Sequence, residues 1–314
     1  MNKRLTAYIV LLGLFICLGV LIIIPVLQIA SAALGAPNVS VRTRVNITNS
    51  PPSVLNVSIT TPVILSANTT TDIYCNVTVR DYNNVSDISS LNVTFFSTLY
   101  SKSETIDFNQ THYSNSSCTN FTDLSEFTRT YNCNLTLNYN AAAGNWTCNA
   151  TVMDNATITG SGFSYTTIND LLAIGVDDLI DFGDLAVLNT SPNIPFNVTN
   201  YGNLPLNLTA YGYGATENDS AAVICDQGNI SIQNLFVSAN FTDITAPIGT
   251  NLMIPLNSSN ATRKLITNLT VIPYNLSLEA ATNTTVWRLF ASGVNTPSGL
   301  CNGTVVFTAI KAFI

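Results

Sequence analysis

The sequence Gly144-Asn-Trp-Thr-Cys-Asn-Ala-Thr-Val-Met-Asp154 alternates apolar and polar side chains residue by residue. Consecutive side chains of a β-strand point to opposite faces of a sheet. The even positions, which include Trp146 and Cys148, are therefore predicted to face a core, and the odd positions to face solvent. Two Asn-X-Ser/Thr motifs (sequons) place Asn145 and Asn149 on the solvent face. The stretch predicts a strand with a core aromatic residue, a buried cysteine and two glycan acceptors.

The same period of two recurs along the chain and predicts an all-β protein. Many short strands separated by turn signals are typical of a β-sandwich. We expect two tandem Ig-like β-sandwich domains, residues 37–168 and 169–314, after an N-terminal hydrophobic helix over residues 1–36. Residues 200–203, Asn-Tyr-Gly-Asn, are predicted to form a hairpin turn between two strands. The predicted strands are residues 38–48, 54–60, 72–80, 91–95, 129–139, 144–154, 164–168, 196–199, 204–210, 229–232, 265–272, 286–291 and 304–310.

The cysteine content predicts disulfides. Seven cysteines are present; Cys17 lies in the hydrophobic segment, and the six outside it suggest three bridges in an exported chain. Six cysteines allow 15 connectivities, so the pairing stays a hypothesis. Cys75 and Cys148 both fall on predicted inward faces, beside Trp146, as in the bridge between the sheets of an immunoglobulin domain. The remaining proposed pairs are Cys118 with Cys133, closing a short loop, and Cys225 with Cys301.

The N-terminus is typical of an exported protein. Lys3 and Arg4 precede an almost purely apolar run over residues 8–24, and Ala30-Ser31-Ala32 fits a signal-peptidase site. The run is also long enough to span a bilayer, so a cleaved signal peptide and a retained signal anchor both remain open. The positive-inside rule keeps the N-terminus cytoplasmic and the bulk of the chain outside. We therefore expect a cell-surface or extracellular protein, with the membrane as a partner if the segment is retained.

The composition indicates a glycosylated surface. Charged residues make up only 9% of the chain, against the usual share of about 25%. The chain contains 26 sequons, whereas its composition alone would give roughly eight. In 18 of them the middle residue is Val, Ile, Leu, Phe, Trp or Ala, as expected where Asn and Ser/Thr face out of a half-buried strand. The predicted glycan acceptors are Asn76, Asn92, Asn134, Asn145, Asn149, Asn197, Asn207, Asn229 and Asn268.

Little in the sequence points to catalysis. Net charge is −7, and the 11 Lys and Arg residues form no run longer than two, which excludes a typical nucleic-acid partner. His112 is the only histidine, and we expect it in a loop or on a strand surface rather than in a triad. No phosphate loop, nucleotide fingerprint or zinc motif is present. We expect a non-enzyme without a cofactor.

One acidic run is a weak candidate for calcium. Asp177, Asp178, Asp181 and Asp184 lie close together at the predicted domain junction, and carboxylates suit a hard cation. Their spacing matches no EF-hand loop. A solvated strand edge is the favoured interpretation.

Several short segments carry a resemblance to other proteins. In the first predicted domain these are Asp72-Ile-Tyr-Cys-Asn-Val-Thr-Val-Arg-Asp81, His112-Tyr-Ser-Asn-Ser-Ser-Cys118 and Gly144-Asn-Trp-Thr-Cys148. In the second they are Ile180-Asp-Phe-Gly183, Asn200-Tyr-Gly-Asn203 and Cys301-Asn-Gly-Thr-Val-Val-Phe-Thr-Ala309. With these segments the chain resembles a group of secreted archaeal Ig-like cell-surface glycoproteins. The resemblance covers most of the exported part and implies a cell-envelope component without established chemistry.

Three functions follow as hypotheses. The first is a non-enzymatic N-glycosylated surface protein with a structural, adhesion or cell-contact role, whose partners are other envelope proteins or cell-surface glycans. The second is a filament subunit in which a strand of one copy, residues 38–48, completes the sheet of the next. The third is a carbohydrate-binding or calcium-dependent module.

Overall fold

A computed structural model describes residues 40–98, 110–116, 118–239, 253–272 and 280–312. The predicted helix over residues 1–36, with Cys17, lies outside the described residues. Within the described ranges no helix has the length and apolarity to cross a bilayer. The contacts divide the chain into Met1–Thr48 and Asn49–Ile314. The second unit is built from antiparallel strands, which confirms the all-β prediction.

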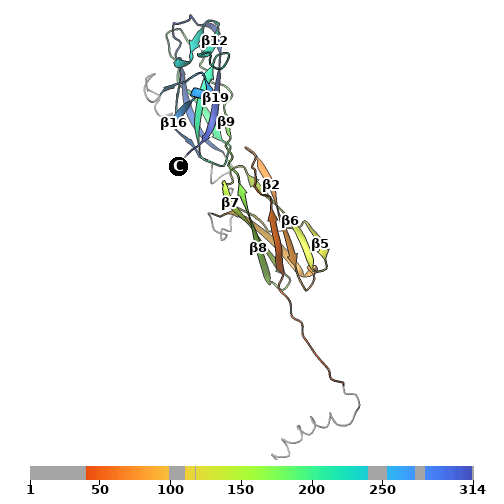
Figure 1. Ribbon diagram of the computed structural model, residues 1–314. Helices are drawn as coiled ribbons and strands as arrows, with labels where there is room; N and C mark the ends of the chain where they lie inside the picture. The colour runs from red at the N-terminus through yellow and green to blue at the C-terminus, as the bar shows by residue number, and fades with distance from the viewer. Residues whose placement is uncertain (1–39, 99–109, 117, 240–252, 273–279, 313–314) are drawn as a thin grey trace, which may run out of the picture. The chain divides into compact units, whose positions relative to one another are not determined.

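The first group of strands forms two four-stranded sheets around one core. β2 and β6 lie side by side in one sheet, and β7 and β8 do so in the other (Figure 1). One sheet has the strand order β1 (Ser53–Ile59), β2 (Thr70–Arg80), β6 (Thr128–Asn138), β5 (Phe121–Ser125). The other has the order β4 (His112–Asn115), β3 (Ile88–Ser97), β7 (Gly144–Asp154), β8 (Thr159–Ile168).

β7 follows the alternating pattern on its inner face. Trp146, Cys148, Ala150 and Val152 are all 0% exposed. The Trp146 ring stacks on Phe95 with centroids 4.7 Å apart, and its indole N–H donates to the Ala142 carbonyl at 2.8 Å. The predicted bounds, residues 144–154, are confirmed. β7 thus supplies the central aromatic contact of this core.

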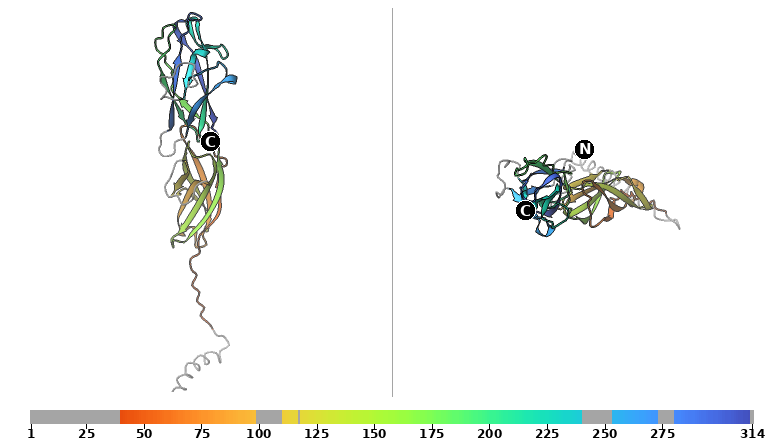
Figure 2. Two further views of the ribbon diagram at one scale, coloured as in Figure 1. Left: turned by 90° about the vertical axis from the view of Figure 1, so that its left-hand side faces the viewer. Right: turned by 90° about the horizontal axis from the view of Figure 1, so that it is seen from above.

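A second group of strands surrounds a separate core that contains Trp287, Phe196 and Leu208. Figure 2 shows these strands, coloured green to blue, from two further directions. Trp287 makes an edge-on contact with Phe307, with ring centroids 5.6 Å apart. The sheet orders are β15 (Ile254–Pro255), β14 (Leu235–Ser238), β17 (Ala281–Leu289), β10 (Ile194–Asn200), β9 (Ile174–Val176); β16 (Lys264–Val271), β11 (Leu206–Tyr213), β19 (Thr304–Lys311); and β13 (Asn229–Ser231), β12 (Ala221–Gln227), β18 (Ser298–Asn302).

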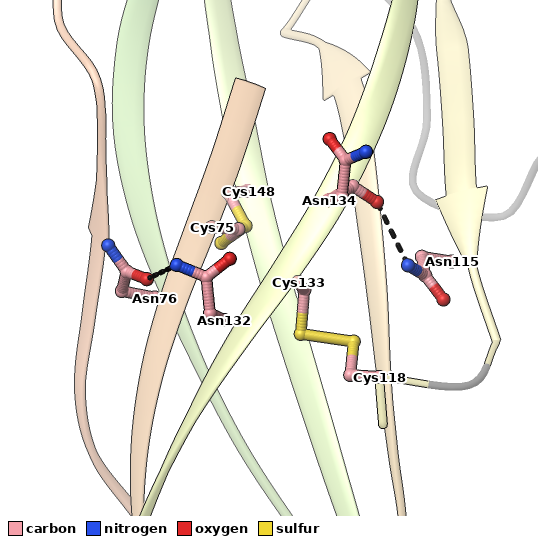
Figure 3. Close-up of a disulfide and its surroundings, with 8 residues drawn as sticks. All are labelled: Cys75, Asn76, Asn115, Cys118, Asn132, Cys133, Asn134 and Cys148. Atoms are coloured by element: carbon pink, nitrogen blue, oxygen red, sulfur yellow. Dashed lines mark hydrogen bonds between the residues drawn. A yellow bond between two sulfur atoms is a disulfide. The ribbon is translucent and has the colours of Figure 1, made fainter. Parts of the chain in front are cut away.

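The three disulfides join the pairs that the sequence analysis favoured. Cys75–Cys148 connects β2 to β7 and so bridges the two sheets of the first core. Cys118–Cys133 ties the segment before β5 to β6, and Cys225–Cys301 joins directly opposed residues of β12 and β18. Figure 3 shows the first two bridges. Three disulfides indicate that the protein resides in an oxidising environment.

Two strand predictions are wrong. Residues 40–48 of the predicted strand 38–48 form no strand, because none of them takes part in a ladder. Residues 200–203 do not make a hairpin, since β10 pairs with β9 and β17 whereas β11 pairs with β16 and β19. Asn200 is 0% exposed and donates to the carbonyls of Leu204 and Val271. These bonds direct the chain from one sheet into another.

Candidate functional site: the sequon-bearing faces of the strands

Several sequon asparagines lie on the outer faces of strands, and others lie in turns and loops. Asn92 in β3 and Asn134 in β6 are exposed, while Val93 and Leu135 beside them are buried. The alternation of the sequence therefore places the Asn and Thr of these sequons outward and the middle residue in the core. Among the other predicted acceptors, Asn145 and Asn197 are exposed, whereas Asn76, Asn207 and Asn229 are half-buried. The side chain of Asn268 lies outside the described residues.

The burial of asparagine depends on whether it belongs to a sequon. Of the 21 sequon asparagines whose side chains are described, 13 are exposed, seven half-buried and one buried. Of the 11 described asparagines outside sequons, only three are exposed and three are buried. The exposed sequon asparagines are Asn46, Asn56, Asn68, Asn92, Asn120, Asn134, Asn145, Asn155, Asn189, Asn197, Asn218, Asn260 and Asn302.

Hydrogen bonding also distinguishes the asparagines inside sequons from those outside them. Asn76, Asn197, Asn207 and Asn229 each accept a hydrogen bond through Oδ1. Within the described residues, their Nδ2 atoms, to which a glycan would be attached, make no hydrogen bond. In Figure 3 the side-chain oxygen of Asn76 accepts the bond from Nδ2 of Asn132, in the neighbouring strand.

At least six of the 11 described asparagines outside sequons donate internal hydrogen bonds through Nδ2. The two Nδ2 bonds of Asn203 go to the carbonyls of Ala141 and Asn169, both at 3.0 Å. Three sequon asparagines resemble this class, because Asn115, Asn155 and Asn257 donate through Nδ2 to backbone carbonyls. Figure 3 includes the bond from Asn115 to the carbonyl of Asn134. Surface position and amide availability thus coincide at most, but not all, sequons.

The prediction that Asn149 faces solvent is wrong. Asn149 and Thr147 are each 7% exposed. β7 is a central strand, and its outer face lies between β3 and β8. Asn149 stands opposite Phe163, and Thr147 opposite Tyr165 and Phe96. Because directly opposed side chains of antiparallel strands lie in contact, these large rings shield the small polar residues of β7.

The acidic run after β9 lies at the surface. Asp177, Asp178, Asp181 and Asp184 are all exposed, and no group of three carboxylates among them converges in the part of the chain that is described. Asp177 Oδ2 accepts the backbone N–H of Asn197, and Asp181 Oδ1 accepts that of Gly183. The carboxylates of Asp177 and Asp181 thus stabilise local backbone, which agrees with the favoured interpretation of a solvated edge.

His112 is not a surface residue as expected. It lies in β4, is only 2% exposed, and its ring stacks on Phe96 with centroids 6.5 Å apart. A different set of side chains, Asp81, Asp87 and Asp154, converges at one end of the first sandwich. Sequence reasoning missed this cluster because Asp154 is distant along the chain from the turn that holds the other two.

No family model and no curated protein matches the chain. Among solved structures, the chain is similar to the CsuC–CsuE chaperone–tip adhesion subunit complex of Acinetobacter baumannii, with 9% identity over 81% of this chain and 99% of that chain and a TM-score of 0.35. It is also similar to the titin Ig tandem domains A164–A165, with 10% identity over 84% of this chain and 97% of that chain and a TM-score of 0.26. A third is the C-terminal domain of the Streptococcus agalactiae AgI/II polypeptide BspA, with 8% identity over 83% and 96% and a TM-score of 0.22.

Proposed function

We propose that this chain is a non-enzymatic, N-glycosylated cell-surface protein whose two tandem Ig-like domains serve a structural, adhesion or cell-contact role. The observation that carries the proposal is the different burial of asparagine: among the described residues, 13 of 21 sequon asparagines are exposed, against three of 11 outside sequons. A preference for polar strand faces alone would not distinguish the two classes. Acceptance of N-linked sugar does distinguish them, because a glycan needs a solvent-exposed amide nitrogen.

The disulfides and the low charge support the same role. Three bridges fit a chain that folds beyond the reducing cytoplasm. With 9% charged residues, an unmodified surface would depend on few charges for solubility. A coat of sugar on the outer strand faces supplies that solubility while the apolar middle residues of the sequons stay in the core.

Site-resolved glycopeptide mass spectrometry of protein from the native host tests the proposal. We expect sugar at Asn92, Asn134 and Asn145, and an unmodified side chain at Asn149. The variants Asn145→Gln and Asn149→Gln form a matched pair on one strand: the first should lose the mass of one glycan and the second none. Bare asparagine at all three exposed positions would overturn the proposal.

A second candidate function, strand-complemented filament assembly, is favoured by one observation. Val41, Val45 and Ile47 are 81%, 81% and 85% exposed and alternate with Arg42, Arg44 and Asn46. Unpaired extended chain with one apolar face is what a sheet edge of another copy accepts. The apolar side chains and the backbone groups between them would then be covered together.

Light scattering of the purified protein at rising concentration tests this assembly. Val45→Lys combined with Ile47→Lys should abolish association, because both changes place charge on the apolar face. Arg44→Ala, on the opposite face, should retain it. A wild-type protein that stays monomeric at millimolar concentration would rule the filament out.

A further inference from the structure

Three carboxylates that no part of the proposed function uses converge at one end of the first sandwich. Asp81 directly follows β2, Asp87 ends the 3₁₀ turn η1 (Val85–Asp87), and Asp154 is the last residue of β7. One carboxylate oxygen from each lies within 4.8 Å of the others. Asp81 and Asp154 are 0% exposed, and Asp87 is half-buried. Three acidic groups from separate elements thus converge at a position that is largely buried from solvent.

One oxygen of the cluster has no partner. Asp81 Oδ1 accepts the backbone N–H of Asn83 at 2.8 Å, whereas the buried Oδ2 makes no hydrogen bond. An unsatisfied buried carboxylate oxygen is costly. Burial raises the pKa of the Asp81 carboxyl, the N–H of Asn83 offsets part of this, and the charges of Asp87 and Asp154 add to it.

In the described part of the chain, no ion pair compensates these charges. The ion pairs found among the described residues are Arg129 with Asp123 and Lys311 with Asp170, and neither includes a member of the cluster. Two fully buried carboxylates beside a third one therefore need another source of positive charge, since burial of an unpaired charge is strongly unfavourable.

The surrounding hydrogen bonds hold the three carboxylates in place. Asp154 Oδ1 accepts the N–H of Ile158 at 2.8 Å, and its Oδ2 accepts Asn49 Nδ2 at 2.7 Å. The turn between Asp81 and Asp87 is fixed by Asn84, whose N–H donates to the Asp81 carbonyl and whose Oδ1 accepts the Ser86 N–H. The Asp87 carbonyl accepts the N–H of Asn155. The carboxylates of Asp81 and Asp154 are therefore positioned by uncharged amide donors, and Asp87 is placed by the backbone bonds of its turn.

We propose that Asp81, Asp87 and Asp154 form a binding site for a divalent cation, and that the cation is Ca²⁺. The ligands are oxygen atoms only, which excludes the sites preferred by zinc and copper. The 4.8 Å limit on their separations is about twice a Ca–O distance of 2.3–2.6 Å. The bound ion would neutralise the carboxylates and tie β2 and β7 to the chain entering at Asn49. The inference does not depend on glycosylation.

Calorimetric titration and thermal unfolding of the full chain in detergent test the site, starting from EDTA-treated protein. With CaCl₂ we expect one ion per chain, and a Kd of about 10⁻⁴–10⁻³ M by comparison with extracellular calcium modules. At 10 mM CaCl₂ the unfolding midpoint should rise by about 3–6 °C. MgCl₂ at the same concentration should give a smaller rise, and an equal rise would overturn the choice of calcium.

The variant Asp81→Asn separates loss of the site from loss of the fold. The side-chain oxygen of Asn keeps the acceptor for Asn83, and its amide nitrogen replaces the unpartnered Oδ2, which removes one negative charge from the cluster. In EDTA this variant should unfold at or above the wild-type midpoint, and CaCl₂ should no longer raise it. The control Asp178→Asn, in the exposed acidic run, should respond to calcium as the wild type does.

Three results would overturn the proposal. One is a wild-type midpoint and titration unchanged by 10 mM CaCl₂. Another is an undiminished calcium response in Asp81→Asn. The third is loss of that response in Asp178→Asn, which would place the ion on the other acidic run.

Discussion

The double variant Cys75→Ala/Cys148→Ala is expected to lose about 4 kcal/mol of unfolding free energy, by the chain-entropy estimate for the 73-residue separation of the two cysteines. Both cysteines are 0% exposed, and their bridge joins the two sheets of the first core. Removal of the bridge raises the conformational entropy of the unfolded chain and leaves space between β2 and β7. Urea unfolding of wild type and variant at one protein concentration measures the difference.

The control is Cys118→Ala/Cys133→Ala. That bridge spans 15 residues, for which the same estimate gives about 3 kcal/mol. It ties the segment before β5 to β6 instead of joining the two sheets. A larger loss in the control than in the Cys75/Cys148 variant would contradict the central role assigned to the inter-sheet bridge.

Trp146→Ala is expected to cost about 3–5 kcal/mol, the range for removing a large buried aromatic side chain. Trp146 is 0% exposed, stacks on Phe95 and lies 6.0 Å from Tyr113 between ring centroids. Alanine would leave a cavity among these rings and remove the N–H donor to the Ala142 carbonyl. The measurement is again the free energy of unfolding in urea.

Trp146→Phe is the matched control, since it keeps an aromatic ring against Phe95 and loses the indole N–H. We expect it to recover more than half of the loss. A Trp146→Ala variant within 1 kcal/mol of the wild type, roughly one net hydrogen bond, would show that the core does not depend on this ring.

The sequence predicted the inner faces of the strands well because a core imposes a strict period of two. The burial of Trp146 and Cys148 was predicted from their even positions in the alternating pattern alone, and that of Cys75 from the same argument on β2. The disulfide pairing then followed from two cysteines on inward faces.

The outer faces were predicted less well because their burial depends on neighbours from other strands. Asn149 has the same local pattern as Asn145, yet only Asn149 lies opposite Phe163 of β8. Nothing within residues 144–154 reveals that neighbour. The acidic site was missed for a related reason: the turn that begins at Asp81 shows two of its carboxylates, but β7 brings the third.

Residues 40–48 show a second reason why an alternating pattern alone does not predict a strand. Alternation there is as regular as in β7, but strand formation also needs a partner with unpaired backbone groups. Val41 and Val45 have no partner in the described part of their own chain. Alternation with a period of two therefore predicts that a segment is able to pair as a strand. Whether the strand forms depends on the presence of a partner strand.

The buried amide of Asn149 has a consequence for the order of events during biosynthesis. An oligosaccharide attached there would have to displace the Phe163 side chain of β8, which lies directly opposite Asn149. Under the proposed glycosylation, packing of the outer face of β7 and transfer of sugar to Asn149 would therefore compete in time.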